Sequence, residues 1–176
     1  MEIKTVVTGY LDENCYVLCE DDSCLIVDPG DDYQKIKNAI GDLKVLGVLI
    51  THSHFDHIGA LRNFLTKRSI KIFKKSNLEE KEYSIGPFTF KCIYTPGHSK
   101  DSVAFYFENN KSMFIGDMIF KESIGRVDLP GGSETEMNQS IDKILKYDDD
   151  ITLYPGHNEI TTLGYEKVNN PYLKKN

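Results

Sequence analysis

The stretch Val45-Leu46-Gly47-Val48-Leu49-Ile50-Thr51-His52-Ser53-His54-Phe55-Asp56-His57 decides the fold and the chemistry expected of this chain. It begins with a short apolar run, typical of a buried strand, and continues into four potential metal ligands within six residues. Because alternate side chains of an extended segment point the same way, His52 and His54 can reach one ion together. After the chain turns, Asp56 and His57 can face a second ion, and Asp56 also stands where a helix N-terminus favours a carboxylate.

The chain has only five histidines, and the two outside this stretch follow a common pattern. His98 ends Thr95-Pro96-Gly97-His98, and His157 ends Tyr154-Pro155-Gly156-His157. Each follows a strand-like segment, and a Pro-Gly turn fixes the backbone where a strand stops. Every histidine therefore stands at a predicted strand end. This pattern favours a metal site over a polar loop whose histidines only form hydrogen bonds.

Composition sets the broad class of the protein. A chain of 176 residues predicts a single domain over residues 1–176, and 40% hydrophobic with 27% charged residues is ordinary for a soluble globular protein. The net charge of −6, without a basic stripe, argues against a nucleic-acid partner. The chain shows no apolar run of the ~18 residues of a membrane span and no signal-peptide pattern at its start. We therefore expect a cytoplasmic protein with a small-molecule substrate and no membrane partner; its oligomeric state is not predicted.

The four cysteines indicate core packing rather than metal or redox chemistry. Cys15, Cys19, Cys24 and Cys92 show no Cys-x-x-Cys spacing and lie in apolar, strand-like segments. Reduced thiols in the core are therefore expected.

The hydrophobic periodicity predicts strands and helices in each half of the chain. Strands are expected over residues 3–8, 15–19, 24–27, 45–50, 70–73, 82–85, 88–94, 102–107, 112–115 and 151–154, with turn residues such as Asp12-Glu13-Asn14 between them. Helices are expected over residues 33–43, 58–65 and 134–147, the last capped by Ser133, and in a short segment before Pro171. Because every ligand candidate follows a strand, we expect two sheets packed face to face, helices outside and the site along one edge.

Several other residues near strand ends allow two interpretations. Asp28, in Val27-Asp28-Pro29-Gly30, is either an ordinary turn residue or a carboxylate that supports a metal ligand. Arg126 either forms a salt bridge with Asp128 that braces its loop or pairs with a substrate carboxylate, and Lys121 is a weaker substrate candidate of the same kind. Most aromatic residues are expected in the core, although Tyr10 and Phe55 are candidates for the wall of a pocket.

The order of the ligand candidates resembles that of the metallo-β-lactamase fold superfamily, and within it the glyoxalase II-type hydrolases. The resemblance is carried by His52-x-His54-x-Asp56-His57, His98, Gly116-Asp117 and His157, with further matches at Asn14-Cys15-Tyr16, Val27-Asp28-Pro29-Gly30 and Gly125-Arg126-Val127-Asp128-Leu129-Pro130-Gly131-Gly132. It implies an α/β (α+β) fold, a four-layer αββα sandwich of two mixed β-sheets with helices on the outer faces. It also implies that His52, His54 and His98 bind one metal ion. The second ion would be bound by Asp56, His57 and His157, and Asp117 would bridge the two.

The activity implied by this resemblance is metal-dependent hydrolysis. A metal-bridged hydroxide would attack a small thioester or ester, as in hydroxyacylglutathione hydrolases, and Asp56 would ligate one ion and orient the nucleophile. The imidazole and carboxylate ligands suit two zinc ions, and iron or manganese also fit. No cysteine stands at a ligand position, which argues against a true metallo-β-lactamase. Because the chain ends soon after His157, it lacks room for the C-terminal helical domain of full-length glyoxalase II, so a short single-domain member is expected.

Other activities stay open at this point. A lactonase of the same superfamily would use the same ligands. A mononuclear iron oxygenase resembling the persulfide dioxygenases would use a triad equivalent to His52, His98 and Asp117. A catalytically silent metal-binding domain is disfavoured because an idle site has no physical need for the complete ligand set. A nuclease is disfavoured by the acidic composition and by the lack of the extra domain that such relatives use.

Overall fold

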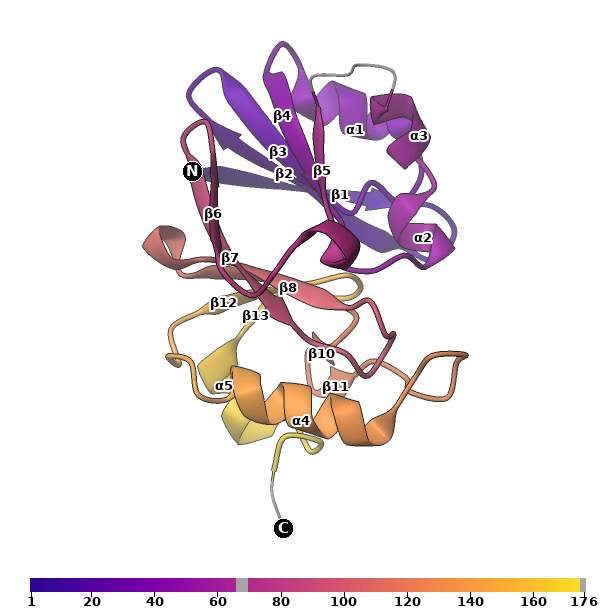
Figure 1. Ribbon diagram of the computed structural model, residues 1–176, viewed down its shortest axis with the longest axis vertical. Helices are drawn as coiled ribbons and strands as arrows, with labels where there is room; N and C mark the ends of the chain where they lie inside the picture. The colour runs from indigo at the N-terminus through magenta and orange to yellow at the C-terminus, as the bar shows by residue number, and fades with distance from the viewer. Residues whose placement is uncertain (66–69, 175–176) are drawn as a thin grey trace.

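Two β-sheets lie face to face in the computed structural model, which describes residues 1–65 and 70–174, and helices flank both outer sides (Figure 1). The first half of the chain forms β1 (Glu2–Thr8), β2 (Glu13–Glu20), β3 (Ser23–Val27), α1 (Tyr33–Ile40), β4 (Lys44–Leu49), α2 (Phe55–Ile58), α3 (Leu61–Phe64) and β5 (Lys71–Phe73). The second half forms η1 (Lys75–Asn77), β6 (Glu82–Ile85), β7 (Phe88–Tyr94), β8 (Val103–Phe107), η2 (Glu108–Asn110), β9 (Ser112–Gly116), β10 (Ile119–Phe120), β11 (Ser123–Ile124), α4 (Glu134–Ile144), β12 (Thr152–Pro155), β13 (Thr161–Thr162) and α5 (Leu163–Asn169).

Both large sheets are mixed, as predicted. The first has the order β1-β2-β3-β4-β5, in which β1, β2 and β3 are antiparallel and β3, β4 and β5 are parallel. The second has the order β13-β12-β9-β8-β7-β6, in which only β9 and β12 pair in parallel. A parallel pair needs a crossover connection, and α1 and α4 lie in such connections.

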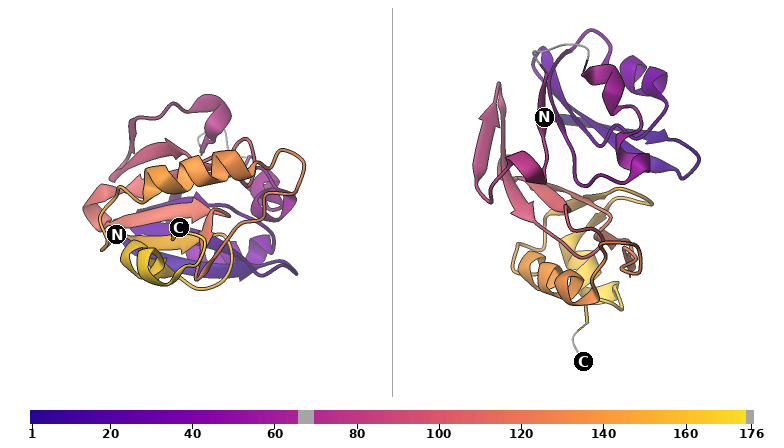
Figure 2. Two further views of the ribbon diagram at one scale, coloured as in Figure 1. Left: turned by 90° about the horizontal axis from the view of Figure 1, so that it is seen from below. Right: turned by 45° about the vertical axis from the view of Figure 1, so that its right-hand side comes forward.

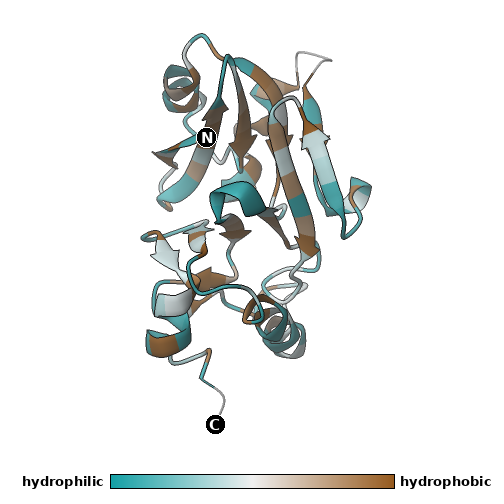
Figure 3. Cartoon of the chain, turned by 90° about the vertical axis from the view of Figure 1, so that its left-hand side faces the viewer, coloured by the Kyte–Doolittle hydropathy of each residue, from teal (hydrophilic) through white to brown (hydrophobic). Residues whose placement is uncertain are grey.

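The core consists of three hydrophobic layers. The layer between the sheets contains Leu18, Leu25 and Phe105; a second joins the first sheet to α1 and α3; a third joins the second sheet to α4 and α5. Strand β2 faces two of these layers, so nearly all of its residues are buried, and most central strands in Figure 3 are coloured as hydrophobic. The right-hand view of Figure 2 shows the two helical layers on opposite outer sides. The predicted αββα sandwich is confirmed.

The predicted helix over residues 58–65 was wrong: the structure has two short helices, α2 and α3, separated at Gly59 and Ala60. The cause is a competing set of hydrogen bonds, because the Ala60 amide donates to the carbonyls of Pro29 (3.0 Å) and Gly30 (2.9 Å) instead of continuing one helix. The close packing also requires a glycine, since a Cβ on Gly59 would lie 2.2 Å from the Gly30 carbonyl oxygen. This packing holds the segment that carries Asp56 and His57 against the end of β3.

The other helices follow the prediction except at their ends. Helix α1 stops at Ile40 because Gly41 adopts φ +60°, a left-handed conformation that favours glycine. Helix α4 begins at the predicted cap, where the Ser133 hydroxyl accepts a hydrogen bond from the Glu136 amide (3.3 Å), and it ends at Ile144 rather than at residue 147. Between β9 and α4, where no strand was predicted, the chain forms the small hairpin β10–β11.

All four cysteines are free and buried, as predicted. Burial raises the pKa of Cys24 to about 12 and of Cys92 to about 11, which keeps these thiols protonated and unreactive. Among the described residues, no helix is both long and apolar enough to cross a membrane.

Truncation of Phe105 tests the layer between the sheets. Phe105 is fully buried, so Phe105→Ala should lower the free energy of unfolding by about 3–5 kcal/mol through lost apolar burial and a cavity. Val168→Ala is the control, because Val168 on α5 is 67% exposed and the change should stay within about 0.5 kcal/mol. Denaturant unfolding measures both values, and equal losses in the two variants would contradict this layer assignment.

Candidate metal centre

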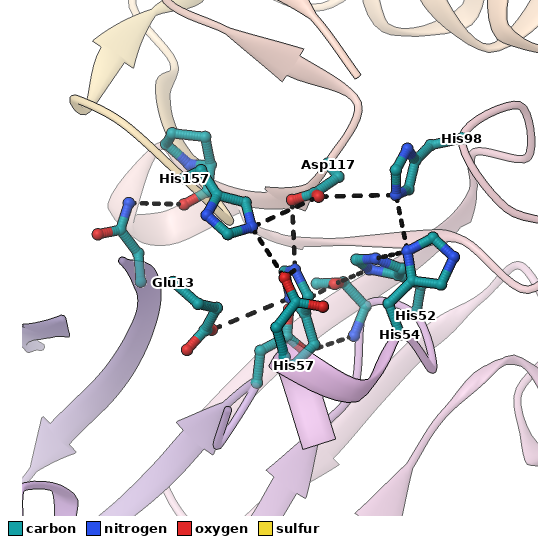
Figure 4. A network of polar contacts seen from close by, with 12 residues as sticks. Glu13, His52, His54, His57, His98, Asp117 and His157 are labelled. Carbon is teal, nitrogen blue, oxygen red and sulfur yellow. Dashed lines mark hydrogen bonds and ion pairs between the residues drawn. The ribbon is translucent and has the colours of Figure 1, made fainter. Parts of the chain in front are cut away.

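Strand ends from both sheets bring the ligand candidates together at one edge of the sandwich (Figure 4). His52 and His54 follow β4, and Asp56 and His57 lie in α2. The second sheet contributes His98 after β7, Asp117 after β9 and His157 after β12. Strands β7, β9 and β12 run in the same direction, because β8 is antiparallel to β7 and β9 while β12 is parallel to β9. Their carboxyl ends therefore meet at the same edge.

The first group of ligand atoms contains three imidazole nitrogens. His54 Nδ1 lies 3.1 Å from His52 Nε2 and 2.9 Å from His98 Nε2. Two ligand atoms of a tetrahedral zinc ion, each about 2.0–2.1 Å from the metal, are about 3.3 Å apart. The spacing of these nitrogens fits a metal site.

The second group contains Asp56, His57 and His157. His157 Nε2 lies 3.2 Å from Asp56 Oδ2, and His57 Nε2 lies 3.9 Å from the same oxygen. One ligand atom from each of the three residues lies within 4.8 Å of the other two, as in the first group. This set of two imidazoles and one carboxylate suits zinc, iron or manganese.

Asp117 lies between the two groups. Its Oδ2 is 3.6 Å from His98 Nε2 and 3.6 Å from His157 Nε2, and its Oδ1 is 3.4 Å from His57 Nε2. Within the described residues, Asp117 Oδ1 and His57 Nε2 are buried and make no hydrogen bond. Buried polar atoms without a partner are costly, and both atoms are good metal ligands. The residues present therefore fit two ions that share Asp117.

Hydrogen bonds to the other ring nitrogens orient these histidines. His98 Nδ1 donates to the Arg126 carbonyl (2.8 Å), His157 Nδ1 to the Leu11 carbonyl (3.0 Å) and His57 Nδ1 to Asp28 Oδ2 (3.0 Å). A donor at Nδ1 leaves the lone pair of Nε2 directed into the centre, which is the form that binds a metal.

Asp28 has the supporting role that the sequence left open. Its Oδ1 accepts a hydrogen bond from the Thr51 amide (2.7 Å), and its Oδ2 accepts from the Thr51 hydroxyl and from His57 Nδ1. The carboxylate therefore links the end of β3 to the end of β4 and to α2.

The histidine pKa values are shifted in opposite directions in the two groups. Burial and the neighbouring histidines lower the pKa of His52 well below its usual value, and burial followed by the proximity of His98 lowers that of His54. Burial also opposes the charged form of His57 and His157, but Asp117 and Asp28 outweigh it at His57, and Asp56 outweighs it at His157. Both pKa values are therefore raised. The second group retains protons at a pH where His52 and His54 are neutral.

If metal ions occupy both groups, acidification should remove them in sequence. A raised histidine pKa means that the proton competes with the metal from a higher pH downward, so the ion of Asp56, His57 and His157 should leave first. Zinc bound per chain, measured after gel filtration in steps from about pH 8 to about pH 5, should fall from two to one and then to zero. The His157→Ala variant should retain its single ion to the lower pH. Loss of both wild-type ions in a single step would contradict the assignment.

Glu13 is a residue of the site that the sequence analysis placed wrongly in a turn. It begins β2, it is 1% exposed, and its Oε1 lies 3.9 Å from His57 Nδ1. The Oε2 atom accepts a hydrogen bond from the Thr8 hydroxyl (2.7 Å), while Oε1 has no hydrogen-bond partner among the described residues. Burial raises the pKa of the carboxyl to about 9, with the Asp28 charge adding to the effect and His57 opposing it. No local sequence signal could have found this role, because burial of a charged residue beside turn-forming neighbours depends on the tertiary fold.

Glu13→Gln should stabilise the metal-free protein more at high pH than at low pH. Because the pKa of Glu13 is higher in the folded state, its stabilising protonated form is present below the unfolded pKa of 4.5 and is lost as pH rises through about 9. A neutral amide avoids this loss and should add about 1–3 kcal/mol to the free energy of unfolding near pH 8. Thermal unfolding should show the difference shrinking towards pH 5; a difference independent of pH would contradict the buried titration.

The other sequence candidates lie around the centre rather than in it. Arg126 forms a two-point ion pair with Asp128 (2.7 Å each), both exposed, and Lys121 pairs with Glu159. The Arg126 backbone carbonyl is the part of this residue that contacts the centre, through His98. A substrate role for the side chains of Arg126 and Lys121 stays a prediction. Tyr10 and Phe55 stack at a centroid distance of 6.3 Å and line a cavity of about 240 Å³ that includes Asp56.

These features define a metal-binding protein of the αββα sandwich class. The family model described as the metallo-beta-lactamase superfamily matches residues 8–82 and 74–157. The chain belongs to the metallo-beta-lactamase superfamily.

Relatives and solved structures of similar length cover nearly the whole chain. "Probable metallo-hydrolase YqgX" of Bacillus subtilis (strain 168) is 32% identical over 98% of this chain and 98% of the relative. "Hydroxyacylglutathione hydrolase GloC" of Haemophilus influenzae (strain ATCC 51907 / DSM 11121 / KW20 / Rd) is 27% identical over 98% of each chain. The crystal structure of BLEG-1 B3 metallo-beta-lactamase is similar at a TM-score of 0.93, with 33% identity over 99% of this chain and 100% of that one. The di-iron-bound form of TTHA1623 has a TM-score of 0.87 and 29% identity, covering 96% and 99%.

Proposed function

We propose that the protein is a hydrolase of small thioesters or esters that uses two divalent metal ions, with zinc as the expected metal. The observation that carries this proposal is the position of Asp117 between two complete ligand groups. The histidines of the second group are held by hydrogen bonds of 3.0 Å, close to the 2.8 Å of the bond that holds His98 in the first group.

When bound, divalent ions would act as Lewis acids towards a carbonyl oxygen and lower the pKa of a bound water to about 7, which is the chemistry that ester and thioester hydrolysis requires. The residues of the chain would determine where the ions bind. His52, His54 and His98 would hold one ion, Asp56, His57 and His157 the other, and Asp117 both. Among the described residues, Asp56 is the ligand candidate that also lines the cavity of Tyr10 and Phe55, so this cavity adjoins the proposed centre.

The cavity supports a small substrate with an apolar part. Its volume of about 240 Å³ lies below the range of about 300–1,000 Å³ that is usual for sites of drug-sized ligands. Exposed Tyr10 and Phe55 provide an apolar wall next to Asp56.

The names of similar proteins agree with this class of reaction but differ in substrate. GloC is named as a hydroxyacylglutathione hydrolase, which acts on a thioester, and BLEG-1 is named as a B3 metallo-beta-lactamase. The di-iron form of TTHA1623 favours keeping iron among the possible metals. A β-lactam and a lactone therefore belong in the substrate panel beside thioesters and esters.

Metal content and hydrolysis of the Asp56→Ala variant test the proposal. Protein purified without added metal should carry about two ions per chain by elemental analysis, and Asp56→Ala should carry about one. The variant should also lose more than about 100-fold in kcat/KM on the best thioester or ester of the panel, because loss of a ligand is at least as severe as loss of a supporting hydrogen bond.

Asp150→Ala serves as the matched control, since Asp150 is an exposed carboxylate paired with Lys111 away from the centre. It should keep both ions and full activity. One iron per chain, unchanged by Asp56→Ala, would overturn the two-ion mechanism and favour the mononuclear oxygenase, which oxygen uptake with glutathione persulfide would then test.

A further inference from the structure

Both Pro-Gly-His turns are anchored through the carbonyl of their proline. The Pro155 carbonyl accepts hydrogen bonds from the Tyr16 hydroxyl (2.6 Å) and from Asn14 Nδ2 (3.2 Å). The Pro96 carbonyl accepts one from the Ser140 hydroxyl (2.6 Å). These donors are distant in sequence from the turns that they hold, and none of them is a ligand candidate.

The glycine carbonyls of the two turns are held in the same way by backbone amides. The Asn14 amide donates to the Gly156 carbonyl (2.7 Å), and the Ser133 amide donates to the Gly97 carbonyl (2.8 Å). Each turn therefore has two consecutive carbonyls fixed from outside. Strand β2 holds the turn before His157, and helix α4 with its cap holds the turn before His98.

Close packing leaves the turns little freedom to move. A Cβ on Gly156 would lie 2.3 Å from Asp117 Oδ1, and a Cβ on Gly97, which adopts φ +143°, would lie 2.4 Å from the Met137 Cα. The donor side chains are themselves buried, with Tyr16 at 1%, Ser140 at 2% and Asn14 at 5% exposure. A hydrogen bond lost here would not be replaced by solvent without rearrangement.

We propose that Asn14 and Tyr16 are positioning residues for the metal ligand His157, and that Ser140 is the positioning residue for His98. The inference rests on the proposed function in requiring two metal ions. Because β2 and α4 share no residue and hold different turns, a change in one element should affect mainly the ion of its own turn. Asn14 has the larger effect on His157, since its Nδ2 also donates to the Asn158 carbonyl (2.9 Å) and so brackets the histidine on both sides.

Zinc affinities in two single-site backgrounds test this separation. The His98→Ala background leaves the group of Asp56, His57 and His157, and the His157→Ala background leaves the group of His52, His54 and His98. In the His98→Ala background, Tyr16→Phe should weaken zinc binding about 3- to 10-fold and Asn14→Ala about 10- to 100-fold. Ser140→Ala should change zinc binding there by less than about 2-fold. In the His157→Ala background, Ser140→Ala should weaken zinc about 3- to 10-fold and Tyr16→Phe should leave it unchanged.

The affinities are measured by competition with a chromophoric chelator, which does not depend on enzyme activity. Ser112→Ala is the matched control, because the Ser112 hydroxyl also donates to a carbonyl from a buried position (to Asn110, 3.1 Å) at the opposite end of β9 from Asp117. Ser140→Thr keeps a hydroxyl and should restore most of the lost affinity. Unfolding temperatures of the metal-free variants show that the fold is retained, and Tyr16→Phe carries the test if Asn14→Ala does not fold.

Equal weakening in both backgrounds, or weakening by Ser112→Ala as large as by Ser140→Ala, would show general loosening and overturn the proposal. No change in either background would overturn it as well. In the otherwise wild-type chain, chelator titration should show that Tyr16→Phe weakens one of the two ions and Ser140→Ala the other. If the wild-type chain binds only one ion, the two-ion function is wrong. The single-site background that still binds zinc then tests whether its Pro-Gly-His turn is positioned as proposed.

Discussion

The metal centre depends on the buried carboxylate of Asp28. It accepts hydrogen bonds from the Thr51 amide, the Thr51 hydroxyl and His57 Nδ1, and so fixes the loop after β4 and helix α2 relative to the end of β3. Asp28 adopts φ +46°, a left-handed conformation that is unfavourable for a residue other than glycine. Hydrogen bonds to an ionised acceptor are among the strongest in proteins, and they offset this strain. The placement of Thr51, which precedes His52, and the ring orientation of His57 follow from this one carboxylate.

The two ligand groups differ in their electrostatic surroundings although they share an edge and a bridging carboxylate. The first consists of imidazoles and lies where burial disfavours positive charge. The second lies among the carboxyl groups of Asp28, Asp56 and Asp117, which favour a cation. A neutral set of nitrogens and an acidic set of mixed ligands bind the same metal with different strength and different dependence on pH. The centre is therefore asymmetric before any substrate is considered.

The ligand candidates could be predicted from sequence because their chemistry is local. The three histidine-bearing segments, residues 52–57, His98 and His157, follow apolar strands along the chain, and strand ends in a two-sheet fold meet at an edge. The supporting contacts could not be predicted, since the Leu11 and Arg126 carbonyls that orient His157 and His98 have no side-chain signature. Local periodicity also failed where tertiary hydrogen bonds outweighed it. The Ala60 amide donates to carbonyls outside the predicted helix and so interrupts it. Glu13 was predicted in a turn, although it begins a buried strand.

Each ligand group takes two residues from the first half of the chain and one from the second, with Asp117 added from the second half. An ion bound to either group would therefore act as a cross-link between the two sheets, which have no strand in common. A ligand that binds only the folded state stabilises it in proportion to the logarithm of its concentration relative to its dissociation constant. Metal supply would then govern how long the folded chain persists against proteolysis, as well as how fast it turns over substrate.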